Sequence, residues 1–246
     1  PSSYFSGQVW FETKPIQAAK MLEHAWTMGV PMKWVTGDEV YGDSSHLRNV
    51  VAEHDRWYVM AVRTNVTVWT ERPEVAVPEW KGAGRKPTRE RILDETIKAM
   101  PADRLVASWP ESHWQRLAVA EGEKGPRIYD WACRRIVENQ DELPSRDGWL
   151  LARRSTSDPD EIAYYLSNAP AETTLLRLAQ IASTRFTVEQ CFEEGKGETG
   201  LDHYEVRHWH SWYRHITLSM MAHAWLASIR LNCNQKKGAK SRFLPT

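Results

Sequence analysis

Residues 32–62 constrain the fold most, because their pattern predicts a strand, a helix and a second strand in succession. Residues 32–36 (MKWVT) are a short apolar run of the kind that forms a buried strand. Ser44 or Ser45 can cap a helix after it, and residues 57–62 (WYVMAV) form the next apolar run. Two strands joined by a helix over about thirty residues are expected to lie parallel in one sheet. The chain is therefore predicted to contain an α/β core.

The flanking segments suggest a core that is interrupted by an insertion. Residues 14–28 have the apolar spacing of a helix, with Pro15 in its first turn. Beyond the second strand, short strand-like runs alternate with turn residues, which is typical of a β-rich segment, and helical spacing then returns over 175–194 and 212–230. The predicted organisation is a core of residues 1–63 and 172–232, a β-rich insertion of residues 64–171, and a basic tail of residues 233–246.

Composition limits the possible partners and the compartment. The net charge is zero, so a DNA-binding surface has to be a local patch. The three cysteines are far apart and odd in number, which predicts neither a disulfide framework nor a thiolate zinc site and favours a reducing cytoplasm. Residues 216–231 are apolar, but the segment contains His223 and is short for a bilayer, so a buried helix is expected and no membrane partner.

Asp38 is the first candidate for chemistry. It follows the predicted strand 32–36 almost directly, and in open α/β sheets ligands and metals bind beyond the carboxyl ends of the strands. A plainer interpretation is that Asp38 is a solvated turn residue or the N-terminal cap of the next helix. The residue alone does not decide between these interpretations.

A second candidate group lies on the helix predicted over 175–194. Arg185 precedes Glu189 by four residues and Lys196 follows it by seven, so the three side chains share one face if the helix continues to Lys196. A glutamate between two cations can bind Mg²⁺ while the arginine and lysine contact phosphate oxygens. An ordinary salt-bridged helix face is the commoner arrangement when such residues are taken without context.

The spacing of these residues resembles the signature of a transposase family. Arg-x3-Glu-x6-Lys is the R-E-K part of the Y-x2-R-x3-E-x6-K signature found in one large group of bacterial insertion-sequence transposases, which are DDE-type enzymes. The block WVTGDEVYG at residues 34–42 resembles the block that carries their second aspartate, and residues 196–215 resemble the block after their glutamate. The family's Tyr falls at Ala182, so its contact with phosphate is not expected here. The resemblance runs from residue 13 to residue 231.

This resemblance implies a fold, a reaction and a set of partners. The fold is a ribonuclease-H-like core, with a mixed sheet and flanking helices. Asp38 and Glu189 are implied as catalytic metal ligands that bind Mg²⁺ or Mn²⁺, with two ions in the complete enzyme. The implied function is DNA transposition, in which phosphodiester bonds at transposon ends are cleaved and joined to a target. The implied partners are double-stranded DNA, both transposon ends and target, and a second copy of the chain in a homodimer.

One part of the family pattern is missing from the sequence. The family places its first aspartate on the first strand, but the residues before Asp38 contain no strand that ends in Asp. Asp43, Asp55 and Asp202 lie on the wrong side of the required order. The chain is therefore expected to be a fragment with a partial ribonuclease-H-like core that does not cleave DNA alone. The alternative is a non-catalytic remnant that binds DNA or a protein partner.

Contacts with DNA phosphates are expected at two groups of basic residues. The first group crowds a Gly- and Pro-containing loop in which Glu90 is the only acid between the cations. A solvated loop without a partner is the alternative. The second group flanks or follows Glu189. The first group consists of Lys81, Arg85, Lys86, Arg89 and Arg91, and the second of Arg185, Lys196 and Arg207.

Two other chemistries fit the sequence less well. Four histidines lie close together, but their spacing matches no known zinc pattern and no cysteine is nearby, so contacts with DNA or with the Glu189 helix are expected instead. A glycosidase that uses Asp38 and Glu189 as acid and base is disfavoured, because the flanking cations favour the ionised carboxylate over a general acid. The histidines are His203, His208, His210 and His215.

Overall fold

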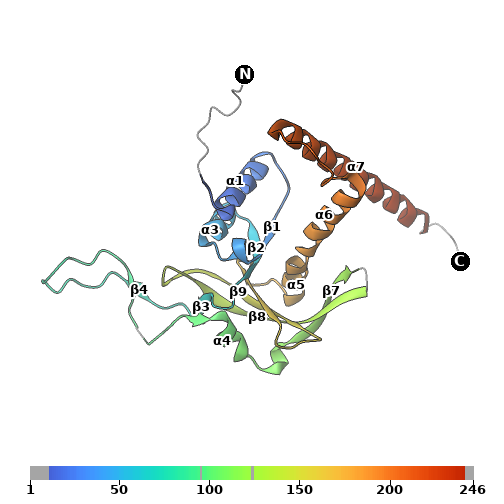
Figure 1. The fold of residues 1–246 in the computed structure, drawn as a ribbon. Helices are drawn as coiled ribbons and strands as arrows, with labels where there is room; N and C mark the ends of the chain where they lie inside the picture. The colour runs from blue at the N-terminus through green and yellow to red at the C-terminus, as the bar shows by residue number, and fades with distance from the viewer. Residues whose placement is uncertain (1–10, 95, 123–124, 242–246) are drawn as a thin grey trace, which may run out of the picture. The chain divides into compact units, whose positions relative to one another are not determined.

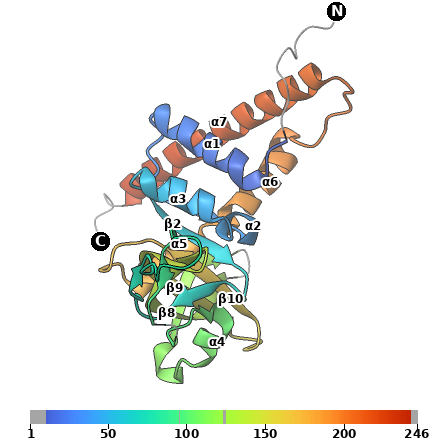
Figure 2. The same cartoon turned by 90° about the vertical axis from the view of Figure 1, so that its left-hand side faces the viewer.

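The computed structural model describes residues 11–94, 96–122 and 125–241. Contacts divide the chain into two units, Pro1–Thr184 and Arg185–Thr246. The helices and strands are drawn in two views in Figures 1 and 2. None of the described helices has the length and apolar character needed to cross a membrane.

The first unit begins with the predicted order of helix, strand, helix and strand. Gly29, with φ of +77°, follows the end of the first helix. Ser44 caps the helix between the two strands, where its Oγ accepts the N–H of Leu47 at 3.3 Å. The two strands pair in parallel, so this prediction is confirmed. The elements are α1 (Lys14–Thr27), β1 (Trp34–Gly37), α2 (Glu39–Gly42), α3 (Ser45–Glu53) and β2 (Trp57–Val62).

The strands of this unit form a mixed sheet flanked by helices, which confirms the predicted fold class. Its order is β1-β2-β10-β9-β8-β3-β6, and β7 pairs with β8. The β1–β2 pair is parallel and the other pairs are antiparallel. β4 (Val75–Ala76) and β5 (Arg91–Ile92) pair to form a separate two-stranded sheet. The remaining strands are β3 (Thr67–Trp69), β6 (Met100–Pro101), β7 (Gln115–Gly122), β8 (Gly125–Gln140), β9 (Leu143–Ser155) and β10 (Ile162–Ser167).

The segment expected to be an insertion shares this sheet with the expected core. β10 pairs along β2, with Tyr164 opposite Val62 and Ser167 opposite Val59. The segment also contains a helix that was not predicted, α4 (Ala102–Ala107), and a short 3-10 turn, Glu111–His113. The division into core and insertion stays a prediction about how the chain is organised. All strands of the segment except β4 and β5 belong to the same sheet as β1 and β2.

Each face of the sheet carries its own hydrophobic core. Successive residues of a strand point to opposite faces, so Tyr58 and Met60 of β2 pack with α1, α3 and α4, and Val59 packs with α5 (Leu175–Ser183) and Trp131. Figure 1 shows α3 and α5 on opposite sides of β2. The central strand β2 is therefore fixed on both faces, and so is β1 beside it.

The second unit contains two helices where the sequence suggested other boundaries. One helix was expected over 175–194, but the helical hydrogen bonding is interrupted at Thr184. Its N–H is shared between the carbonyls of Gln180 and Ile181, and its hydroxyl bonds Ile181 O at 2.7 Å, a local competition that ends α5. Beyond this point lie α6 (Phe186–Thr199) and α7 (Trp209–Ser241). The helix α7 extends through much of the predicted basic tail, and residues 242–246 lie outside the described residues.

Candidate metal and DNA site

Asp38 lies directly beyond the carboxyl end of β1, as predicted. It is half-buried and caps α2, where its Oδ1 accepts the N–H of Val40 at 3.0 Å. The alternative interpretation as a helix cap is therefore also true. The cap does not exclude a metal, because it uses one carboxylate oxygen and the second has no donor among the described residues. A hard divalent cation prefers such an oxygen ligand.

The single turn of α2 is held firmly against β2. The carbonyl of Asp38 accepts the N–H groups of Tyr41 at 3.1 Å and Gly42 at 2.8 Å. Gly42 lies so close to β2 that a Cβ atom there would be 1.8 Å from the carbonyl oxygen of Ala61. At the end of the turn, Asp43 accepts the N–H of Arg63 at 3.1 Å and also pairs with its guanidinium. The turn that carries Asp38 is thus fixed at both ends.

A buried polar cluster that the sequence did not reveal lies behind this turn. The carboxylate of Glu138 on β8 pairs with Arg48 of α3 at 3.0 Å and accepts a hydrogen bond from the hydroxyl of Tyr58. Burial, and then the negative charge of Glu138, raises the pKa of Tyr58 well above its ordinary value, so this phenol stays protonated and donates. The only sequence signals are charged residues beside apolar ones, Arg48 after Leu47 and Glu138 after Ile136 and Val137.

Glu189 lies on α6 in the second unit. Its Oε1 is 3.4 Å from a guanidinium nitrogen of Arg185, and its side chain is 60% exposed. The helix continues through Gly195 to Thr199, so Lys196 is on the same continuous helix, as the spacing required. An exposed ion pair of this kind contributes at most about 1 kcal/mol to stability, so the arrangement has little structural value of its own.

The predicted site residues fall into both units. The structure brings Arg185 and Glu189 together in the second unit and places Asp38 in the first, so a metal site that joins Asp38 and Glu189 stays a proposal. Within the described residues, no group of three or more His, Cys, Asp or Glu side chains is placed to hold a metal ion. His215, one of the clustered histidines, has its Nε2 2.8 Å from the carbonyl oxygen of Gly200, in the loop between α6 and α7.

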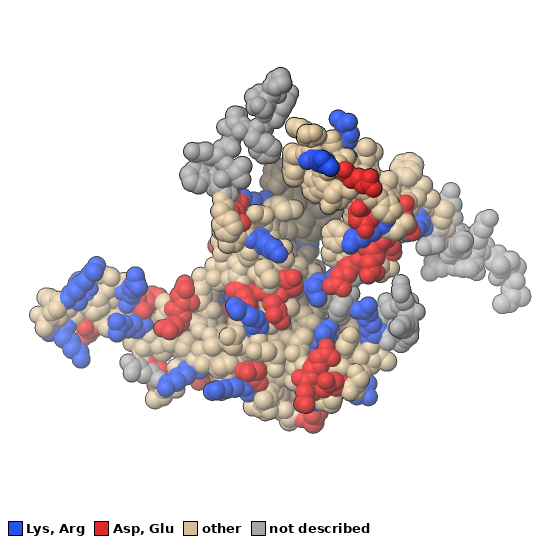
Figure 3. Space-filling view, viewed as in Figure 1, with Lys and Arg blue, Asp and Glu red and all other residues tan. Residues whose placement is uncertain are grey.

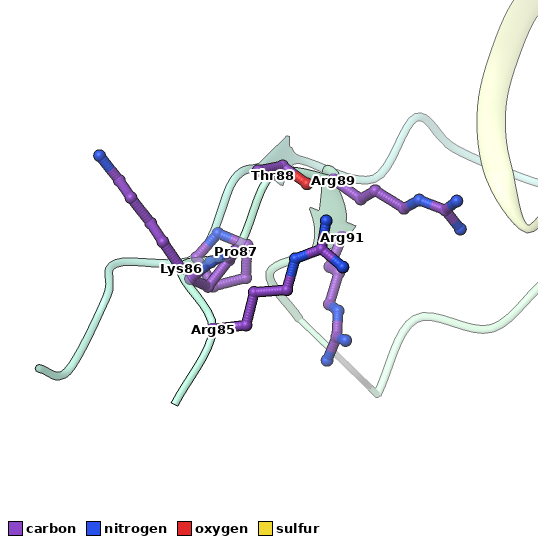
Figure 4. Close-up of a pocket in the computed structure, with 7 residues that line it drawn as sticks. Arg85, Lys86, Pro87, Thr88, Arg89 and Arg91 are labelled. Atoms are coloured by element: carbon purple, nitrogen blue, oxygen red, sulfur yellow. The ribbon is translucent and has the colours of Figure 1, made fainter. Parts of the chain in front are cut away.

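The first group of basic residues lies on the hairpin of β4 and β5. In Figure 1 this hairpin extends away from the main sheet of its unit, and in Figure 3 Lys and Arg side chains gather on it. The side chain of Lys86 points away from the guanidinium groups of Arg85, Arg89 and Arg91 (Figure 4). An open hollow of about 470 Å³ is lined by Pro78, Arg85, Lys86, Pro87, Thr88, Arg89 and Arg91. Four of these seven residues are cationic, which suits an anionic ligand.

A comparison with protein families finds a similarity over the first half of the chain. Residues 7–126 match the family model described as DDE superfamily endonuclease. Over these residues the chain is similar to the DDE superfamily endonucleases. The match contains Asp38, the buried Arg48 and the basic hairpin, whereas Glu189 and Glu138 lie beyond it. A comparison with curated proteins finds no match. DDE superfamily endonucleases act on DNA and generally use divalent metal ions.

Proposed function

We propose that this protein is a DDE-type transposase, and that Asp38 and Glu189 are two of its metal-binding carboxylates. The observation that carries the proposal is the position of Asp38, at the carboxyl end of β1 and within the residues that match the superfamily. The R-E-K spacing on α6 supports the assignment of Glu189. Mg²⁺ or Mn²⁺ ions bound there would activate a water or a 3′-hydroxyl for in-line attack and stabilise the leaving oxygen of the phosphodiester.

In this proposal the carboxylates bind the metal ions and the basic residues bind the DNA. Asp38 keeps one oxygen on the N–H of Val40 and offers the other to a cation. Arg185 and Lys196 beside Glu189 would hold the DNA backbone near the carboxylates, a role that does not depend on base sequence. Arg207 and the basic hairpin would contact phosphates further along the duplex. The resemblance to transposases also suggests a homodimer on paired transposon ends.

A complete site of this kind needs a third carboxylate, which we propose comes from outside the described residues. β1 is the last strand of its sheet, and its outer edge has no strand partner among the residues that the structure describes. An unpaired edge can accept a further strand. The resemblance places the first aspartate on a strand of the same core, so a strand added here would bring it near Asp38.

The test is metal-dependent cleavage of transposon-end DNA by the complete gene product. We expect Asp38→Asn and Glu189→Gln each to lower kcat/KM at least about 100-fold, because loss of even a supporting group of a metal ligand costs about 10–100-fold. Asparagine caps a helix as well as aspartate does, so Asp38→Asn removes the charge while the fold is kept. Glu39→Gln and Glu193→Gln, exposed neighbours of the two carboxylates, are the matched controls and should retain activity.

The outcomes separate the transposase from the non-catalytic alternative. Residues 1–246 alone are expected to bind DNA without cleaving it. Cleavage that persists in Asp38→Asn at the wild-type rate would remove Asp38 from the site. DNA binding by the complete gene product with no metal-dependent cleavage under any condition would instead favour a remnant that binds DNA or a protein partner.

The basic hairpin gives a separate prediction about DNA affinity. Each phosphate contact contributes about 0.9 to the slope of log K against log salt concentration. We therefore expect Arg85→Ala/Arg89→Ala to reduce this slope by about 1.8, measured by fluorescence anisotropy of labelled duplex DNA between low and moderate salt. Arg104→Ala/Arg177→Ala, which removes two exposed arginines elsewhere in the same unit, is the control. Equal slopes for the two double variants would exclude the hairpin as a DNA contact.

A further inference from the structure

The buried cluster of Arg48, Tyr58 and Glu138 is linked directly to the turn that carries Asp38. The side chains of Arg48 and Glu138 are each only 4% exposed. While Nε of Arg48 binds Glu138, its Nη1 donates to the carbonyl of Gly42, the last residue of α2. The N–H of Gly42 in turn binds the carbonyl of Asp38 at 2.8 Å. A continuous chain of polar contacts therefore runs from Glu138 to Asp38.

The link matters because α2 has little stability of its own. A helix of one turn is far shorter than the length at which an isolated helix becomes stable. The carbonyl of Gly42 belongs to the last turn, where carbonyl groups have no partner inside the helix. Arg48 supplies that partner from α3. A second arginine, Arg146, donates to the carbonyl of Arg48 at 2.9 Å and fixes α3 to β9 from the other side.

A gain in stability does not account for this arrangement. Replacing a buried ion pair with apolar residues of similar size is often neutral or stabilising, because burying two charges costs much of what their attraction returns. A guanidinium has one property that apolar side chains lack, a rigid fork of donors that can bind two acceptors in fixed directions. Here the two acceptors are the carboxylate of Glu138 and the turn after Asp38.

We propose that Arg48 and Glu138 are positioning residues that orient the Asp38 carboxylate for metal binding. The proposal rests on the proposed function of Asp38. It also gives the segment 64–171 a role in the site, because Glu138 on β8 is 90 residues from Arg48 in sequence. Glu138 holds the guanidinium, the guanidinium holds the end of α2, and α2 holds Asp38 at the end of β1.

Arg48→Lys is the discriminating variant. Lysine keeps the positive charge beside Glu138, but a single ammonium group does not reproduce the fork that reaches both acceptors. We expect kcat for DNA cleavage to fall about 10–100-fold with little change in KM, because the basic hairpin is untouched. We also expect faster hydrogen exchange at the amides of Tyr41 and Gly42, which bind the carbonyl of Asp38. Arg154→Lys, the same change in an arginine that binds Glu111 through two of its guanidinium nitrogens, is the control and should show neither effect.

A second variant covers the case in which Arg48→Lys does not fold. Arg48→Met/Tyr58→Phe/Glu138→Leu replaces the whole cluster by apolar side chains, which is expected to preserve folding while the donor to Gly42 is lost. It should show the same fall in kcat and the same faster exchange. Wild-type amide protection at Tyr41 and Gly42 in a folded variant would overturn the proposal. This exchange measurement needs no activity, so its outcome is independent of whether the proposed transposase function is correct.

Discussion

Replacing Glu138 with glutamine is expected to lower the free energy of unfolding by about 3–5 kcal/mol. Glutamine fills nearly the same volume and can still accept one hydrogen bond, but it removes the negative charge that balances Arg48. The guanidinium would then be a buried, uncompensated charge, since its side chain is 4% exposed. Such a charge is among the few changes with effects this large. Urea unfolding followed by circular dichroism measures the difference.

An exposed ion pair of the same unit provides the control for this variant. Arg72 and Asp147 lie 2.8 Å apart, but their side chains are 48% and 60% exposed. Asp147→Asn is therefore expected to change the free energy of unfolding by less than about 1 kcal/mol. If Glu138→Gln cost no more than this control, Glu138 and Arg48 would not form the buried pair on which the proposed positioning of Asp38 depends.

The part of the fold that the sequence predicts well is the part with strong local signals. A proline near the start of α1, a serine cap before α3 and the uninterrupted apolar run of β2 each lie within a few residues of the element that they specify. Signals of this kind depend only on neighbouring residues. The short helix α4 was missed because its six residues give less than two turns of periodicity, within a segment whose other runs are strand-like.

Long-range pairing explains what the sequence did not reveal. The antiparallel pairing of β10 with β2 joins residues about a hundred positions apart. No local sequence pattern specifies which other strand a given strand will pair with. The same holds for Glu138 and Arg48. The two residues are 90 positions apart in the sequence, and only the folded structure shows that each compensates the charge of the other.

The candidate site shows the same division between local and distant information. The position of Asp38 at a strand end follows from the local pattern, and the structure confirms it. The spacing predicted that Arg185 and Glu189 lie close together, and they form an ion pair, although Arg185 is the N-cap of α6 and does not lie within one helix over 175–194. Spacing also allowed the plainer interpretation of Asp38 as a helix cap, which is equally correct. Glu189 follows Asp38 by more than 150 residues, so the proposal that both bind metal at one site comes from the resemblance to transposases and not from local spacing.

Gly42→Ala is expected to lower the free energy of unfolding by at least about 3 kcal/mol, the upper range for overpacking a core. The added Cβ would lie 1.8 Å from the carbonyl oxygen of Ala61 and 2.9 Å from its carbon. Both atoms belong to the backbone of β2, which is packed on both faces and paired on both edges, so it has little freedom to move. The gain in helix propensity from alanine, about 1 kcal/mol, does not offset this clash.

Gly197→Ala is the matched control, because it makes the same substitution in a helix where a Cβ would meet no atom within 4 Å. It should stabilise its helix by up to about 1 kcal/mol, so the two variants are expected to shift the midpoint of thermal unfolding in opposite directions. The result bears on function as well as on stability. Gly42 places the turn of α2 on β2 and presents its carbonyl to Arg48, so a well-tolerated alanine would mean that this turn does not lie against the sheet. Asp38 would then lose the support that holds it at the end of β1, and the proposed metal site would lose its best-placed ligand.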